Sequence, residues 1–94
     1  MSRLLVEIDG ETVPLSDCFW IRANAAGCAY SSMWAGPSTA SADLAYREFV
    51  PLKRDRDRET RQGWTVRLLT PTQWRQQAAP CFNGKCEHRK AASA

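Results

Sequence analysis

The chain has 94 residues, of which 44% are hydrophobic and 24% charged, and its formal net charge at pH 7 is +3. A chain of this length builds one small domain that buries about 60–65% of its unfolded surface, and this composition excludes wholesale disorder. No apolar run approaches the roughly 18 residues of a membrane span, and the N-terminus lacks the apolar stretch of a secretory leader. We therefore expect a cytoplasmic protein with no membrane partner, folded as one domain over residues 1–90 with a frayed tail at residues 91–94.

The two halves of the chain carry opposite net charge. Residues 1–50 hold three basic and six acidic side chains, a net charge of −3, whereas residues 51–94 hold ten basic and four acidic ones, a net charge of +6. Ten of the 13 basic residues are arginine, whose planar guanidinium group binds carboxylates and phosphates through paired hydrogen bonds. The basic half therefore favours a partner with an acidic surface, either a protein or a nucleoprotein complex.

The N-terminal segment has the pattern of a β-hairpin. With Asp9 and Gly10 as a two-residue turn, alternate apolar residues of the two strands fall on one face, namely Leu4, Val6, Val13 and Leu15. Residues 18–22 and 28–34 are the next expected strands, joined by a turn that contains Asn24 and Gly27.

Two helices are expected further along the chain. The first covers residues 41–50, with Ser41 as N-cap, and ends where Pro51 forces the preceding residue out of the helical conformation. The second begins at Thr70, which can form a capping box with the glutamine three residues later, and is closed by Pro80.

The stretch between these helices starts with residues 52–63, the least regular part of the pattern. A helix there would place Arg54 beside Arg58 and Asp55 beside Glu59, like charges that repel each other at this spacing. We therefore expect a solvated loop, with the tips of two strands as the alternative, that ends at Gly63. A half-buried strand follows over residues 64–70. The whole pattern predicts an α+β fold: an N-terminal hairpin and a small antiparallel sheet, covered on one face by two short helices.

The sharpest local motif is the segment APCFNGKCEH at residues 79–88. If Asn83 and Gly84 form a type I′ turn, Cys81 and Cys86 face each other across a short hairpin, and His88 points to the same side as Cys86. Two cysteines at close spacing, with a histidine nearby, are typical of zinc ligands. The motif therefore predicts a zinc staple at the C-terminal end of the fold.

A structural zinc ion takes four ligands, so at least one more must come from the other thiols, Cys18 and Cys28. The expected metal ligands are Cys28, Cys81, Cys86 and His88. Two alternatives stay open: buried free thiols, or disulfides, which a reducing compartment disfavours. In each case we expect the cysteines to stabilise a small hydrophobic core and not to form an active site.

Arginines and tryptophans are the candidate partner-binding residues. They are Arg54, Arg56, Arg58, Arg61, Arg67, Arg75, Trp20 and Trp34. Trp64 and Trp74 fall on expected inward faces and are assigned to the core, whereas the aromatic residues around Trp20 and Trp34 are denser than one side of a sheet can bury. An exposed aromatic patch of this kind marks an interface.

No catalytic motif accompanies these residues. The chain has no HExxH, no glycine-rich phosphate loop and no GxSxG, so we expect no enzyme activity. The favoured hypothesis is a small regulator or inhibitor that docks on a larger protein or nucleoprotein machine. The alternative is a nucleic-acid-binding or transcription-associated module, which the acids interleaved among the arginines at 53–61 disfavour.

Overall fold

The computed structural model describes residues 5–86, and these form an α+β fold. The strands of an N-terminal hairpin, β1 (Leu5–Ile8) and β2 (Glu11–Pro14), precede an antiparallel sheet of three strands in the order β4-β3-β5. The bounds of these strands are β3 Phe19–Ala23, β4 Ala29–Trp34 and β5 Thr65–Leu69. The predicted fold class, the hairpin and the strands are confirmed.

Three helices accompany the sheet. They are α1 (Ala42–Phe49), α2 (Lys53–Arg61) and a composite C-terminal helix made of α3 (Pro71–Gln73), a π-helical segment (Trp74–Ala78) and α4 (Ala79–Phe82). Short 3₁₀ turns cover Leu15–Asp17 and Pro37–Thr39. Within residues 5–86, no helix has both the length and the apolar character needed to cross a membrane.

The hairpin turn forms as its sequence predicts. Asp9 and Gly10 have φ angles of 52° and 82°, the two positive values that a type I′ turn requires, and Val6 pairs with Val13. Val6, Val13 and the buried Leu15 pack into one hydrophobic cluster. Leu4, the fourth member of that predicted face, lies outside the described residues, as does the tail at 91–94.

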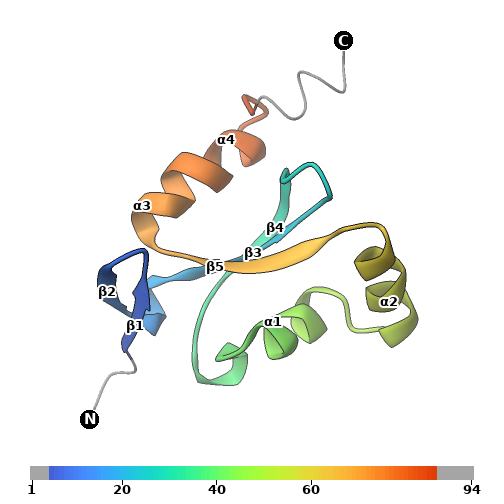
Figure 1. The fold of residues 1–94 in the computed structure, drawn as a ribbon, viewed down its shortest axis with the longest axis horizontal. Coiled ribbons are helices and arrows are strands. Elements are labelled where there is room, and N and C mark those ends of the chain that lie inside the picture. The colour runs from blue at the N-terminus through green and yellow to red at the C-terminus, as the bar shows by residue number, and fades with distance from the viewer. Residues whose placement is uncertain (1–4, 87–94) are drawn as a thin grey trace.

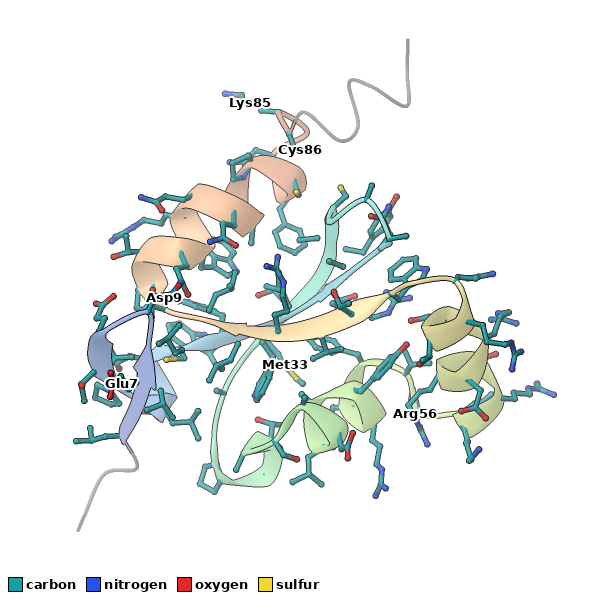
Figure 2. All side chains as sticks on the ribbon, in the orientation of Figure 1. Glu7, Asp9, Met33, Arg56, Lys85 and Cys86 are labelled. Atoms are coloured by element: carbon teal, nitrogen blue, oxygen red, sulfur yellow. The ribbon has the colours of Figure 1, made fainter. Side chains whose placement is uncertain are left out.

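Helices cover both faces of the sheet, where only one covered face was expected. The C-terminal helix lies on one side of the three strands, and α1 and α2 lie on the other (Figure 1). Trp20 of β3 packs with Leu68 and with Ala45 of α1, whereas the next residue, Ile21, packs with Ala78 of the C-terminal helix. Figure 2 shows Met33 between the sheet and α1. Because β3 is apolar on both sides, it needs cover on both sides.

The expected loop at residues 52–63 is instead helix α2, and that prediction was wrong. Ion pairs of opposite charge, Lys53 with Asp57 at 2.7 Å and Arg58 with Asp55 at 3.0 Å, offset the like-charge neighbours along the helix. A tertiary contact then holds the helix in place, because the buried carboxylate of Glu59 pairs with a strand residue, Arg22, at 2.6 Å. The repulsion between like charges on α2 is real but smaller than these contributions.

The C-terminal helix continues past Pro80, which was expected to end it. Before this proline the helix widens into a π-helical segment, in which the N–H of Ala79 bonds to the carbonyl of Trp74, and the proline enters as the second residue of α4. Asn83 and Gly84 then form a helix C-cap instead of a hairpin turn. The N–H of Gly84 (φ 73°) bonds to the carbonyl of Cys81, and the N–H of Lys85 bonds to that of Pro80, which is the Schellman arrangement.

Candidate functional site

Three of the four cysteines converge where the end of the C-terminal helix meets the turn between β3 and β4. The sulfur atoms of Cys28, Cys81 and Cys86 all lie within 4.8 Å of one another, and those of Cys28 and Cys86 are 3.7 Å apart. The three residues are buried, and no disulfide joins them. We call this group the cysteine triad.

Local backbone structure positions each member of the triad. The side-chain oxygen of Asn24 accepts hydrogen bonds from the N–H groups of Ala26 and Cys28, both at 3.0 Å, and so orders the turn that carries Cys28. Cys81 lies in α4, and Cys86 follows the glycine C-cap that reverses the chain after the helix (Figure 2). The helix cap therefore brings Cys81 and Cys86 together, a result that the expected hairpin would also have produced.

The sulfur spacing suits a tetrahedral metal ion. Zn–S bonds of about 2.3 Å at tetrahedral angles place the sulfur atoms about 3.8 Å apart. The observed 3.7 Å between Cys28 and Cys86 matches this edge and is far longer than the S–S bond of a disulfide, about 2.05 Å. The buried triad could therefore hold a metal ion such as zinc.

Burial controls the ionisation of Cys81, the member of the triad that lies in α4. It raises the pKa of the Cys81 thiol to about 11; contact with the backbone of Ala29 opposes this rise, and the thiols of Cys28 and Cys86 add to it. Without a metal, Cys81 is therefore protonated at neutral pH. Since a thiolate is the ligating form, a metal ion must displace protons from the triad, and its binding should strengthen as the pH rises.

The other two candidate ligands do not complete this group within the described residues. Cys18 is buried in the cluster on the α1 face of the sheet, where its sulfur lies 3.6 Å from the carbonyl oxygen of Pro14. His88 lies outside the described residues, two positions after Cys86. Of the four predicted ligands, the structure thus unites Cys28, Cys81 and Cys86.

A row of aromatic rings forms a second candidate site, on the same face of the sheet as the C-terminal helix. Trp34 contacts Phe19 with ring centroids 4.1 Å apart, Phe19 contacts Trp74 at 5.1 Å, and Trp74 stacks with Phe82 at 6.1 Å. The indole N–H of Trp74 donates to the Ser32 hydroxyl, which fixes the centre of the row. At the two ends, Trp34 and Phe82 remain 63% and 40% exposed. We call these four rings the aromatic row.

The two predicted partner-binding tryptophans differ in exposure. Trp34 is exposed, as expected, but Trp20 is 6% exposed, and its indole N–H donates to the carbonyl of Thr39 at 2.6 Å. Trp20 is therefore a core residue, and its assignment to an exposed patch was wrong. Strand alternation explains the difference, because Phe19 and Trp20 point to opposite faces and each face has its own helix layer. Trp64 and Trp74 are half-buried.

The predicted arginines do not form one surface. Arg54, Arg58 and Arg61 are exposed on α2, whereas Arg67 lies on β5 and Arg75 on the C-terminal helix. Arg56 is half-buried, and its guanidinium donates to the carbonyls of Val50 and Pro51 at 2.8 and 2.7 Å, so it supports the α1–α2 connection (Figure 2). Five of the six arginines thus remain exposed, on α2, on β5 and on the C-terminal helix.

Comparison with known proteins identifies no relative of this chain. The chain matches no protein-family model, and no curated protein or solved structure resembles it at a significant level. Any functional interpretation therefore rests on the residues described above.

One polar cluster has no counterpart among the sequence predictions. Glu59 accepts hydrogen bonds from Arg22 at 2.8 and 2.6 Å and from the Tyr46 hydroxyl at 3.0 Å, and Arg22 also lies 4.1 Å above the ring of Trp64. The Arg22 guanidinium holds the pKa of Glu59 below its usual range. The sequence signal is the spacing: Arg22 lies two positions after Trp20 in an expected strand, so both share one strand face, and a cation on a covered face needs a partner.

Proposed function

We propose that the protein is a small non-enzymatic regulator or inhibitor that docks on a larger protein through the aromatic row. The observation that carries this proposal is the row itself, which ends in a tryptophan that is 63% exposed on the edge strand β4. Tryptophan and arginine are the residue types that dominate binding energy at protein interfaces. The row offers an apolar ridge whose rings already contact one another without a partner, which reduces the ordering cost of binding.

Charge favours a partner with an acidic surface. Residues 62–86, which include the C-terminal helix, contain Arg67, Arg75 and Lys85 and no acidic residue. A partner that inserts an apolar segment against Trp34 and Phe82 would lie on the same side of the sheet as these cations, whose positive field favours an acidic surface. The same field would repel a basic partner, so the docking surface selects partners by their charge.

A nucleic-acid target is the second candidate and has weaker support. On α2, Lys53 and Arg58 are paired with Asp57 and Asp55, so part of the positive charge is already compensated. The other predicted arginines that are exposed lie on α2, β5 and the C-terminal helix, so no single element presents all of them to a phosphate backbone. An aromatic row can stack bases, however, so the test must separate the two targets.

The cysteine triad has a structural role in this proposal. A zinc ion held by Cys28, Cys81 and Cys86 would tie the end of α4 to the β3–β4 turn, and so would fix Phe82 beside the sheet. The fourth ligand would come from His88 or from outside the chain. The metal would supply no chemistry beyond this staple.

The test compares two variants in partner capture from a nuclease-treated lysate of the cells that encode the protein. Trp34→Ala truncates the row, and Leu52→Ala removes a similarly exposed apolar side chain, 52% exposed, from the opposite layer. We expect one stoichiometric protein to be retained by the wild type and by Leu52→Ala and lost by Trp34→Ala. Equal capture by both variants, or capture of no protein, would refute the proposal.

The nucleic-acid alternative is tested in parallel by titrating random single-stranded and double-stranded oligonucleotides at several salt concentrations. Tight binding whose log-log salt slope is steeper than about −3 would mean that several phosphates are neutralised. That result, combined with no protein capture, would replace the proposed function by the alternative.

A further inference from the structure

A cavity of about 550 Å³ lies between β5, the C-terminal helix and the β3–β4 turn. Its lining includes Arg67, Lys85, Gln76 and Gln77, together with Cys86 of the triad. The aromatic row follows the β4 side of the helix, whereas Arg67 places this cavity on the β5 side, so the two features are separate. The volume falls within the range of about 300–1,000 Å³ that is usual for small-molecule sites.

Among the described residues, the cavity lining combines cations and amide groups and includes no acidic residue. Neither Arg67 nor Lys85 forms an ion pair with any residue from 5 to 86. The nearest acids along the described chain precede residue 60, on the hairpin, the first 3₁₀ turn, α1 and α2. Gln76 and Gln77 add side-chain N–H donors. The lining is therefore rich in donors and positive charge, which suits an anion.

The position of Arg67 on β5 is suited to binding a ligand in the cavity. Thr65, Arg67 and Leu69 alternate on the face of β5 that the C-terminal helix covers, and Leu69 is part of the core there. Arg67 is exposed there, so its guanidinium group can bind an anion that enters the cavity. A charge on an edge strand also discourages pairing with another chain, and β5 is an edge strand. Titration with phosphate separates these two roles.

We propose that this cavity binds a phosphorylated small molecule, with Arg67 and Lys85 as the residues that hold the phosphate. A guanidinium group binds a phosphate through two parallel hydrogen bonds, and a lysine adds a point charge beside it. A cavity of about 550 Å³ has room for an organic group beside the phosphate. The expected ligand therefore carries an organic body as well as a phosphate.

The experiment follows side-chain and backbone NMR signals of the full chain during titration with four probes. These are inorganic phosphate, pyrophosphate, adenosine 5′-monophosphate and uncharged adenosine. We expect saturable shifts at Arg67, Gln76 and Gln77 with the charged probes and none with adenosine. Tighter binding of the nucleotide than of inorganic phosphate would show that the organic body is bound as well.

Matched variants identify the residues. Arg67→Gln and Lys85→Gln should each weaken binding at least about tenfold, since each removes a charge-assisted contact. Arg75→Gln is the control, because it removes the same charge from an exposed residue of the C-terminal helix that does not line the cavity. It should change binding less than twofold. Because these side chains are exposed, all three variants should fold.

Three outcomes would overturn the proposal. One is the absence of saturable shifts at tens of millimolar phosphate. Another is equal weakening by Arg75→Gln, which would indicate diffuse attraction of anions. The third combines two results: the wild type binds no phosphate, and Arg67→Gln loses bound zinc. Together they would mean that these cations support metal binding by the cysteine triad. None of these results depends on whether the aromatic row binds a protein.

Discussion

Replacing Glu59 by glutamine tests whether one buried ion pair holds α2 on the domain. The Glu59 carboxylate accepts two hydrogen bonds from Arg22, at 2.8 and 2.6 Å, and a third from Tyr46 at 3.0 Å. The side chains of Arg22 and Glu59 are only 18% and 10% exposed. Glutamine keeps the shape of glutamate but turns an N–H₂ group toward one of the Arg22 donors. The variant therefore leaves a nearly buried cation without its counter-charge.

The size of the effect follows from this geometry. Removing one partner of a buried ion pair costs about 3–5 kcal/mol. Arg22 keeps its contact with the ring of Trp64 and some access to water, so we expect about 2–3 kcal/mol. A domain of this length has a total stability of about 5–14 kcal/mol, and each kcal/mol moves its melting temperature by about 4–8 °C. The melting temperature should therefore fall by roughly 10–20 °C.

Urea and thermal unfolding followed by tryptophan fluorescence and circular dichroism measure this change. The pH dependence gives a second readout. The pKa of Glu59 is lowered in the folded state, so its contribution is complete above the ordinary glutamate value of about 4.3 and is lost as the pH falls through the lowered pKa. The stability difference between wild type and Glu59→Gln should therefore be constant near pH 7 and shrink below about pH 4.

Asp57→Asn is the matched control, because it breaks the pair with Lys53 on the exposed side of the same helix, where the side chains are 48% and 80% exposed. Its effect on the free energy of unfolding should be far smaller than that of Glu59→Gln, because solvent screens an exposed pair. If Glu59→Gln and Asp57→Asn had the same small effect, α2 would be held by its own helical pairs, and the reasoning about Glu59 would be refuted.

Three further predictions concern the cysteine triad and the C-terminal helix. Native mass spectrometry should find one zinc ion per chain in the wild type and in Cys18→Ser, and none in Cys81→Ser; retention of zinc by Cys81→Ser would exclude the triad as the site. After chelation, iodoacetamide should modify Cys81 slowly at pH 8 and faster at pH 10, because burial raises its pKa to about 11, and rapid modification at pH 8 would contradict that shift. Thr70→Ala should cost about 1–2 kcal/mol in urea unfolding, because Thr70 and Gln73 exchange cap hydrogen bonds at 3.2 and 3.1 Å, whereas Thr70→Ser should retain most of the stability.

Interactions between near neighbours in the chain were predictable from the residues alone. The Asp9–Gly10 turn, the Ser41 N-cap and the Thr70 capping box each join atoms within three residues of one another, so residue type and spacing are sufficient to place them. Apolar alternation over residues 64–70 predicted β5, and the turn signals Asn24 and Gly27 between two strand-like segments predicted β3 and β4. The proximity of Cys81 and Cys86 was also predicted, although a helix cap produces it and not a hairpin.

Contacts between distant parts of the chain decided the rest. Helix α2 is held by Glu59 against Arg22, 37 positions earlier, and the triad joins Cys28 to Cys86 across 58 positions. Trp20 became a core residue because α1 covers its face of the sheet. Local pattern identifies which residues alternate or cap, since those effects act over one turn of helix or one strand pair. Distant segments determine which face of the sheet is covered and which charged side chain is buried, because they supply the helices that pack on each face.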